Sequence, residues 1–384
     1  MDIVFHDGLE HNSLKPLTLT RPVSDLRVGI LTISEKWSRI LDAKNISFAT
    51  AEHLRKKFPE KPGDLHIRGG LLPCPHLVEA IKLLKNGECL MSGVEWLAHK
   101  NGEVMISFDG SYQIIKRPEN IFSCNKKELD SDFDLLTLGR KSETISDSNK
   151  VFGKRVFLEK GAVVEGATLN SSDGPIYLAQ DSEVMEGSMI RGGFALGESS
   201  KLKLGTKIYG ATSIGPFCKV GGEINNSVIW GFSNKGHDGF LGNAVLGQWC
   251  NIGAGSSNSN LKNNYDDVKL YSYDSGRFES TGLQFCGLIM ADHSKCAINT
   301  SFNTGTVAGV SCNIFGSGFP RNYIPDFSWG GPQGYSEYSI DKAIATAERV
   351  MFRRGLVMDE IESDILSAVY DQTSELRGGM ALAK

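Results

Sequence analysis

The chain has 384 residues, and its 41 lysines and arginines against 45 aspartates and glutamates give a formal net charge of −4. No long basic block is present, which disfavours a nucleic-acid-binding groove, and no apolar run reaches the roughly 18 residues that predict a membrane-spanning helix. The opening segment "MDIVFHDGLE" is acidic where a secretory signal is positively charged, so we expect a soluble, cytoplasmic protein.

The cysteines exclude two further classes of protein. They are scattered without a Cys-x-x-Cys pair, so neither a zinc ribbon nor a disulfide framework is predicted. We expect reduced, mostly packed thiols at Cys74, Cys89, Cys124, Cys218, Cys250, Cys286, Cys296 and Cys312.

Residues 1–135 are typical of a globular α/β domain. A strand is predicted in "DIVFHD", and "LTISEKWSRILDA" predicts an amphipathic helix capped by Ser34. "PHLVEAIKLLKNGECLM" predicts a second helix, stopped by Gly87 and followed by an extended segment. Because the chain is longer than one ordinary domain, at least one further domain is expected.

Residues 136–335 contain a repeat with a period of six, which fits neither a helix nor the two-residue alternation of a simple strand. The period suits a solenoid whose coils have three short flat faces, with aliphatic side chains inside and small residues at the bends. A gap in the repeat at 221–239 predicts a loop, and the spacing leaves the handedness open. The aliphatic positions are Leu158, Val164, Leu178, Val184, Ile190, Leu196, Leu202, Ile208, Ile214, Val220, Phe240, Leu246 and Ile252.

Residues 336–384 predict a short helical tail. "YSIDKAIATAERVMFRRG" has Ser339 before an apolar-periodic run and Gly355 after it. "MDEIESDILSAVYDQ" begins another helix with early acidic residues. We expect these helices to cap the last coil, whose open edge would otherwise expose unpaired backbone groups.

The segment "SNKGHDGFLGNAVLGQWCNIGAGSSNSN" resembles the left-handed parallel β-helix acyltransferases. The resemblance is to the bifunctional glucosamine-1-phosphate acetyltransferase and N-acetylglucosamine-1-phosphate uridyltransferase family. The family's Gly-His pair corresponds to Gly236 and His237, its Gly-Asp/Asn pair to Gly242 and Asn243, and its Asn-Ile-Gly-Ala-Gly run to residues 251–255.

The resemblance implies that His237 takes a proton as a sugar amine attacks the thioester of acetyl-CoA. An imidazole suits that task because its ordinary pKa, near 6.5, lets it accept a proton at neutral pH. The "IGAG" turn, Gly253, Ala254 and Gly255, would offer backbone N–H groups to the developing oxyanion, with Ala254 as the expected donor. Residues expected to hold the acceptor sugar or its phosphate are Asn251, Asn260, Asn243, Glu223, Lys235 and Lys207.

Two features complicate this interpretation. Family members usually carry an aromatic hydroxyl three residues after the histidine, where this chain has Phe240, and Ser256 and Ser257 stand at family-typical threonine positions. Some solenoids of this shape instead resemble carbonic anhydrases with three histidines on zinc, but the repeat region contains only His237 and His293.

The N-terminal segment resembles a divergent group of predicted sugar nucleotidyltransferases fused to a β-helix, through "LKPLTLTRPVSDLRVGILTISEKW", "GGLLPCPHLVEAI" and "DFDLLTLGR". That implies a Rossmann-like nucleotidyltransferase domain, although the usual glycine-rich phosphate loop is missing. Lys15, Arg21 and Arg27 are candidate phosphate ligands, and Asp7 or Asp25 a candidate magnesium ligand. The alternative is that both arginines bridge loops structurally.

Two functions of different class follow. The first is an enzyme that acetylates a hexosamine 1-phosphate with acetyl-CoA and condenses it with UTP or another NTP, using Mg²⁺, to give a sugar nucleotide such as UDP-N-acetylglucosamine. The second is a catalytically degenerate, sugar-nucleotide-binding scaffold or sensor. For either, the resemblance implies a homotrimer, with CoA in the groove between neighbouring coils.

Overall fold

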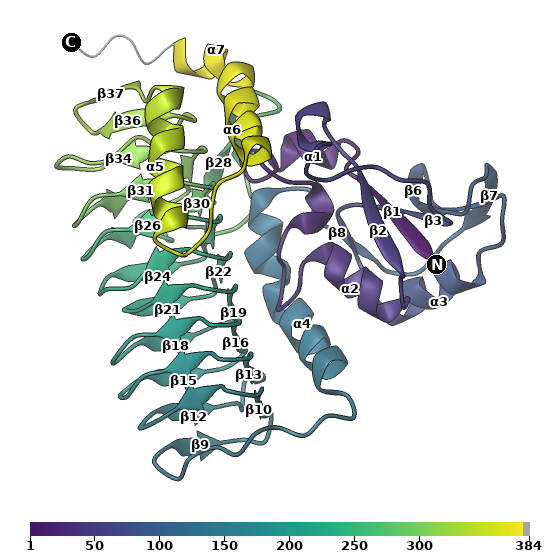
Figure 1. Ribbon diagram of the computed structural model, residues 1–384, viewed down its shortest axis with the longest axis horizontal. Coiled ribbons are helices and arrows are strands. Elements are labelled where there is room, and N and C mark those ends of the chain that lie inside the picture. The colour runs from purple at the N-terminus through teal and green to yellow at the C-terminus, as the bar shows by residue number, and fades with distance from the viewer. Residues whose placement is uncertain (379–384) are drawn as a thin grey trace.

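The computed structural model describes residues 1–378, so the last six residues of the predicted tail, 379–384, lie outside the described part. An N-terminal α/β domain lies beside a long β-solenoid, and helix α4 runs between the two (Figure 1). This agrees with the fold class that the sequence predicts.

The N-terminal domain is built on a six-stranded mixed sheet in the order β2-β1-β3-β6-β5-β7. The predicted first strand is β1, and the predicted helix at 31–43 is α2, but its cap is Thr32 rather than Ser34. The Thr32 hydroxyl accepts from the Glu35 N–H while the Glu35 carboxylate accepts from the Thr32 N–H. The elements of this domain are β1 (Asp2–His6), α1 (Glu10–Ser13), α2 (Ile33–Ile40), β2 (Asn45–Ala49), β3 (Leu65–Arg68), β4 (Leu71–Leu72), α3 (Pro75–Leu83), β5 (Glu88–Ser92), β6 (Glu95–His99), β7 (Val104–Ser107), β8 (Gln113–Ile114) and α4 (Pro118–Thr137).

The solenoid consists of parallel strands stacked in three flat faces, each coil passing from the first face to the second and then to the third (Figure 1). The first face contains β10 (Val156–Leu158), β13 (Ile176–Leu178), β16 (Phe194–Leu196), β19 (Thr212–Ile214), β22 (Val228–Ile229), β25 (Val245–Leu246), β30 (Ile289–Met290), β33 (Val307–Ala308) and β35 (Tyr323–Ile324). The second contains β11 (Val163–Val164), β14 (Glu183–Val184), β17 (Lys201–Leu202), β20 (Lys219–Val220), β23 (Asn234–Lys235), β26 (Asn251–Ile252), β31 (Lys295–Cys296), β34 (Asn313–Ile314), β36 (Ser328–Gly331) and β37 (Gly334–Glu337).

The third face contains β9 (Lys150–Phe152), β12 (Thr168–Asn170), β15 (Met189–Arg191), β18 (Lys207–Tyr209), β21 (Glu223–Asn225) and β24 (Phe240–Gly242), and β27 (Ser257–Asn258) and β32 (Ser301–Phe302) continue it. Between β24 and β27, hydrogen bonds from side chains to the backbone take the place of backbone–backbone hydrogen bonds. The Asn258 amide group bonds both the N–H and the C=O of Gly242, and the Ser257 hydroxyl accepts from the Phe240 N–H.

The predicted aliphatic positions form the solenoid core, with two corrections. Apart from Phe240, all of them are buried. In β24 the inward residue is Leu241, which pairs with Ile224, while Phe240 pairs with the outward Glu223. The prediction of a loop at 221–239 is wrong, because β21, β22 and β23 continue the stack there.

The repeat disappears at 221–239 because one coil is shorter than its neighbours. Val220 pairs with Leu202, eighteen residues earlier, but its next partner is Lys235, fifteen residues later. Lys235 therefore occupies an inward position that aliphatic side chains fill in neighbouring coils, and its side chain is only 1% exposed.

The C-terminal helices pack along the side of the solenoid, not across its end (Figure 1). Helices α5 (Ile340–Phe352) and α6 (Glu360–Gln372) bury apolar residues against the first–second corner of the solenoid and against Leu19 and Leu54 of the N-terminal domain. A short α7 (Ser374–Arg377) follows. The expectation that the helices cap the last coil is therefore wrong, and the edge of β36 is instead paired with antiparallel β37.

Buried polar contacts hold the two domains together. The Arg21 guanidinium pairs with Asp292 of the solenoid and with Asp25, and it lies 4.8 Å from the Trp230 ring centroid. The buried amide of Asn125, in α4, donates to the Ala211 carbonyl of the solenoid at 2.8 Å. An insertion after β27 forms the hairpin β28 (Lys269–Ser272) and β29 (Arg277–Ser280).

The cysteines and the helices of the described part of the chain bear on the class of protein. All eight cysteines are free and five are buried, as predicted for reduced, packed thiols. None of the helices found in residues 1–378 is long and apolar enough to span a membrane.

Candidate functional site

His237 lies on the corner between the second and third faces, in the short segment that joins β23 to β24. Its side chain is exposed, while the strands on either side of the corner are tied into the solenoid. The position allows the imidazole to meet a solute without any movement of the core.

The backbone of this corner is fixed from inside and from the next coil. The ammonium of buried Lys235 donates to the carbonyls of His237 and Gly221, and the Gly255 N–H donates to the Asp238 carbonyl at 3.0 Å. Gly239 has a φ of +121° and lies so close to Ser256 that a Cβ would be 2.0 Å from its carbonyl oxygen. The corner is therefore preorganised, which a positioned base requires.

The neighbours of His237 along this corner have almost no side chain. The preceding coil crosses this corner with Gly221 and Gly222 alone, because only two residues lie between Val220 and Glu223 where four lie between their partners Lys235 and Phe240. The register that pairs Asn234 with Asn251 places Ala254 one coil after His237. Adjacent coils lie about 4.8 Å apart. One coil away on either side, the imidazole therefore has no neighbouring side chain larger than a methyl group.

Larger apolar residues lie further along this corner. Leu204, two coils before His237, and Ile298, two coils after it, lie on the same corner, and these side chains are 68% and 69% exposed. Exposed apolar side chains therefore lie on either side of His237 on this corner, which we call the His237 corner.

In the described part of the chain, the turn beside His237 offers one backbone N–H donor that has no acceptor. The N–H groups of Gly253 and Gly255 are bonded to the carbonyls of Cys296 and Asp238, whereas the Ala254 N–H has no acceptor within residues 1–378. Leu204 and Ile298 have equally free N–H groups in equivalent turns, but there a large side chain lies beside the donor. Ala254 thus combines a free N–H with open access.

A cluster of basic residues lies on the second face next to the corner that carries His237. No sequence motif predicted this cluster. Desolvation lowers the pKa of Lys219, and the neighbouring Arg354, Arg353, Lys203 and Lys201 lower it further. Arg354 is brought there by the end of α5 and donates to Asn234 at 2.9 Å. Such a cluster suits a polyanion. Its only sequence signal is the lysines of β17 and β20, since the arginines come from a distant helix.

The residues predicted to hold the acceptor sugar are dispersed. Lys207 and Glu223 lie side by side on the third face, where Glu223 accepts from the Tyr209 hydroxyl and raises the pKa of Tyr209 to about 12. Asn251 is exposed on the second face. Asn243 and Asn260 lie at the third–first corner, away from the His237 corner.

Two of these predictions need correction. Asn260 donates to the Asn243 side chain at 2.8 Å, so the two amides hold each other. Lys235 is wrong as a mobile phosphate ligand, because it lies inside the solenoid, where desolvation lowers its pKa to about 8.

The groups predicted to bind nucleotide in the N-terminal domain are already engaged. Arg21 is buried in its pairs with Asp292 and Asp25, and Arg27 donates to the Ile30 carbonyl within its own loop. Both therefore bridge loops, the alternative left open by the sequence. Lys15 is half-buried, and desolvation lowers its pKa.

The carboxylates predicted for magnesium do not fit that role. Asp7 is buried and accepts from the Val23 N–H, the Thr50 hydroxyl and His11. Asp25 faces Arg21 at 3.2 Å. Both oxygens of Asp7 are therefore occupied, and the Asp25 carboxylate already has a guanidinium as its counter-charge.

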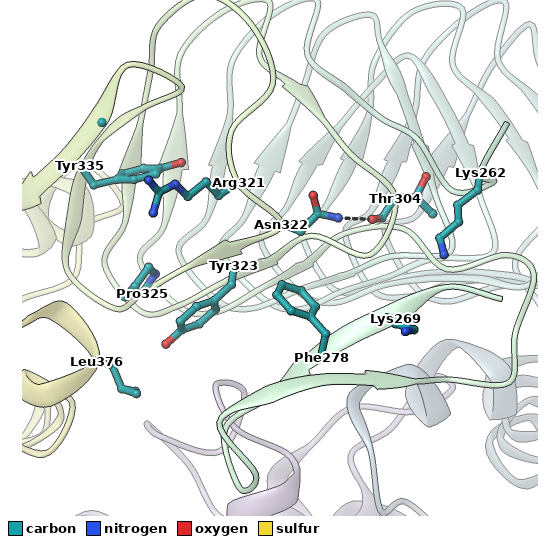
Figure 2. Close-up of a pocket in the computed structure, with 11 residues that line it drawn as sticks. Lys262, Lys269, Phe278, Thr304, Arg321, Asn322, Tyr323, Pro325, Tyr335 and Leu376 are labelled. Carbon is teal, nitrogen blue, oxygen red and sulfur yellow. Dashed lines mark hydrogen bonds between the residues drawn. The ribbon is translucent and has the colours of Figure 1, made fainter. Parts of the chain in front are cut away.

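A pocket of about 760 Å³ lies elsewhere, at the third–first corner near the C-terminal end of the solenoid (Figure 2). Lys262, Lys269 and Phe278 come from the inserted hairpin region, and Arg321 and Tyr323 from the last coils. No residue predicted for catalysis lines this pocket. The corner that carries His237 and this pocket are therefore separate features of the surface.

The zinc alternative is not supported in the solenoid. His293 is at the first–second corner with its ring stacked on Trp249, whereas His237 is at the second–third corner. Within residues 1–378, three histidines come together only in the N-terminal domain.

Residues 3–141 match the family model described as sugar nucleotidyl transferase. The chain thus joins a sugar nucleotidyl transferase-like domain to a parallel β-solenoid that carries the exposed His237 on one corner. Its resemblance to the bifunctional nucleotidyltransferase/acetyltransferase family, indicated by the sequence motifs, is confirmed by similarity to curated members at low identity.

Three such relatives illustrate the similarity. A bifunctional sugar-1-phosphate nucleotidylyltransferase/acetyltransferase of Sulfurisphaera tokodaii is 26% identical over 62% of this chain and 53% of its own length. The bifunctional protein GlmU of Methanocaldococcus jannaschii is 25% identical over 67% and 57%, and that of Synechococcus elongatus 28% over 50% and 40%. The chain spans about half the length of these relatives. A solved structure of Arabidopsis UDP-N-acetylglucosamine acyltransferase aligns with 62% of this chain and 94% of its own at 18% identity, with a TM-score of 0.23.

Proposed function

We propose that the solenoid transfers an acetyl group from acetyl-CoA to the amine of a hexosamine 1-phosphate, with glucosamine 1-phosphate as the expected acceptor. The observation that carries this proposal is the exposed His237, fixed on its corner and flanked one coil away by the free N–H of Ala254. A base next to an oxyanion donor is the pair of groups that acyl transfer to an amine requires.

The reaction proceeds by attack of the amine nitrogen on the thioester carbonyl carbon. As the C–N bond forms, His237 takes the proton that the amine loses, and the Ala254 N–H donates to the carbonyl oxygen as it becomes negative. The C–S bond then breaks, and CoA leaves as a thiolate that is protonated by the imidazolium. His237 is thereby returned to its neutral form.

The basic cluster of Lys201, Lys203, Lys219, Arg353 and Arg354 supports a polyanionic acyl donor. Acetyl-CoA carries phosphate groups at the end of a long, partly apolar arm. The corner beside this cluster carries the exposed apolar side chains of Leu204 and Ile298. A protein of net negative charge that gathers five cations at one place has a local field that attracts phosphates.

For the N-terminal domain we propose condensation of the acetylated sugar phosphate with UTP or another NTP, releasing pyrophosphate and forming a sugar nucleotide such as UDP-N-acetylglucosamine. The family match over residues 3–141 supports this half of the reaction. Mg²⁺ would neutralise phosphate charge in such a transfer. The engagement of Asp7, Asp25 and Arg21 supports the second candidate, in which this domain is a degenerate, sugar-nucleotide-binding scaffold or sensor.

The test of the acetyl transfer is a thiol-release assay with acetyl-CoA and glucosamine 1-phosphate. Loss of a general base costs roughly 100-fold to 10,000-fold in rate, so His237→Ala should lose that much of kcat. Exposed His76, on α3, offers the matched control, and His76→Ala should turn over as the wild type does. Equal turnover by His237→Ala and the wild type would exclude the imidazole as the base.

A second assay separates the two proposals for the N-terminal domain. Pyrophosphate release from UTP, N-acetylglucosamine 1-phosphate and Mg²⁺ should be detectable if the domain is a nucleotidyltransferase. Binding of UDP-N-acetylglucosamine without pyrophosphate release would support the scaffold or sensor. Sedimentation should give a trimer, and a monomer with full acetyltransferase activity would contradict the expectation that the active protein is a homotrimer.

A further inference from the structure

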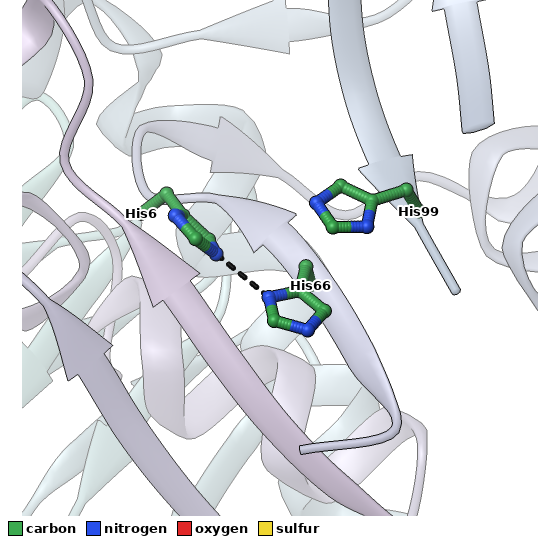
Figure 3. A group of neighbouring side chains, drawn as sticks. All are labelled: His6, His66 and His99. Atoms are coloured by element: carbon green, nitrogen blue, oxygen red, sulfur yellow. Dashed lines mark hydrogen bonds between the residues drawn. The ribbon is translucent and has the colours of Figure 1, made fainter. Parts of the chain in front are cut away.

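Three histidines from three neighbouring strands meet on one face of the N-terminal sheet (Figure 3). His66 in β3 pairs directly with His99 of β6, so the two side chains project from the same face. His6 in β1 lies two residues after Val4, the partner of His66, and so it shares that face too. The sequence intervals between the three give no sign of this meeting.

The spacing of the three rings is close to what one metal ion requires. One nitrogen from each ring can be chosen so that all three lie within 4.8 Å of one another. Ligands 2.0–2.1 Å from a tetrahedral ion are roughly 3.3 Å apart, and the ring centroids are then roughly 5 Å apart. The observed centroid separations are 5.1, 4.4 and 6.1 Å, so the spacing fits, and rotation of the stacked His66 and His99 rings would turn their lone pairs toward one ion.

Hydrogen bonds leave suitable lone pairs on this face. The His66 Nε2 donates to the Asn101 side-chain oxygen at 3.2 Å, which places the lone pair on Nδ1. That Nδ1 then accepts from the Nε2–H of His6 at 2.8 Å, and an ion bound to both rings would replace this hydrogen bond. The Nδ1 of His99 is buried and has no partner among the described residues, which costs free energy unless something binds it.

We propose that His6, His66 and His99 form a binding site for one divalent transition-metal ion of the Zn²⁺ type. Three imidazoles without a carboxylate favour Zn²⁺, Co²⁺, Ni²⁺ or Cu²⁺ over Mg²⁺ and Ca²⁺, which prefer oxygen ligands. All three residues are partly exposed, so a water molecule can take a fourth position. The site is distinct from Asp7 and Asp25, the carboxylates predicted for magnesium, and from the corner that carries His237.

Isothermal titration of metal-free full-length protein with Zn²⁺ alone tests the site. We expect one equivalent to bind to the wild type. His99→Phe keeps a ring to stack on His66 but removes its nitrogens, and it should weaken binding by more than the roughly 10-fold to 100-fold that loss of an outer partner costs. Asn101→Ala, which removes such an outer partner, should fall within that range.

The controls separate this site from other metal ligands. His76→Gln removes an exposed histidine outside the cluster and should bind Zn²⁺ as the wild type does. Titration with Co²⁺ should give a spectrum without the intense thiolate charge-transfer band expected if cysteines bound the ion. Wild-type protein that fails to bind Zn²⁺, a thiolate spectrum, or unchanged affinity in His99→Phe would each overturn the proposal, while circular dichroism verifies that the variant is folded.

Discussion

The buried ammonium of Lys235 should make the protein less stable at neutral pH than an apolar variant. Its side chain occupies an inward position of the solenoid, and desolvation lowers its pKa from 10.5 to about 8. A lowered lysine pKa means that the unfolded chain binds the proton more tightly than the folded one. The penalty is therefore fully present below pH 8 and is lost as the pH rises toward 10.5.

The magnitude follows from the pKa difference between the two states. Each unit corresponds to about 1.4 kcal/mol, so the penalty is roughly 3 kcal/mol at low pH. Lys235→Met fills the same volume without a charge. The difference in unfolding free energy between this variant and the wild type should favour the variant more at pH 7 than at pH 10, by roughly 2 kcal/mol.

Urea denaturation at both pH values, in the presence of a thiol reductant, measures this difference. Lys207→Met is the matched control, because Lys207 is exposed, and it should stay within about 0.5 kcal/mol of the wild type at both pH values. A Lys235→Met difference that is the same at pH 7 and pH 10 would refute a buried ammonium. Because Lys235 also holds the His237 carbonyl, the variant should lose acetyl-transfer activity even where it is more stable.

Two further substitutions test the Ala254 N–H as the oxyanion donor and the buried ion pair between the two domains. Ala254→Leu should unfold like the wild type, since equivalent turns already carry Leu204 and Ile298, but kcat/KM for acetyl-CoA in the thiol-release assay should fall by up to roughly 100-fold as the N–H becomes obstructed. Arg21→Ala leaves the buried Asp292 carboxylate unpaired and should cost about 3 to 5 kcal/mol in urea denaturation, whereas an unchanged urea midpoint would show that this ion pair does not hold the domains together.

The period of six was enough to predict the solenoid and most of its core. Positions such as Leu178, Ile190 and Leu246 are buried as the pattern requires, because a coil repeats its inward positions at a fixed local spacing. The same local reasoning failed at 221–239. A coil three residues shorter breaks the period in the sequence without breaking the stack, so the pattern alone could not separate it from a loop.

Recognition of His237 and the "IGAG" turn also came from a contiguous stretch of sequence, and the structure places these two features one coil apart on one corner. Their surroundings were beyond the sequence. The basic cluster needs Arg353 and Arg354 to return from a C-terminal helix to the strands of Lys201 and Lys219. Sequence spacing carries no information about which distant segments dock together.

Local periodicity thus determined the solenoid core, and a compact motif singled out His237 as the candidate base, because both patterns depend on neighbours within a few residues. The tertiary structure decided which polar groups are free. It buries Arg21 against Asp292 and Lys235 inside a shortened coil, and it brings His6 to His66 and His99 across three strands. These contacts join residues far apart in the chain, and strand register and domain docking set them rather than sequence spacing.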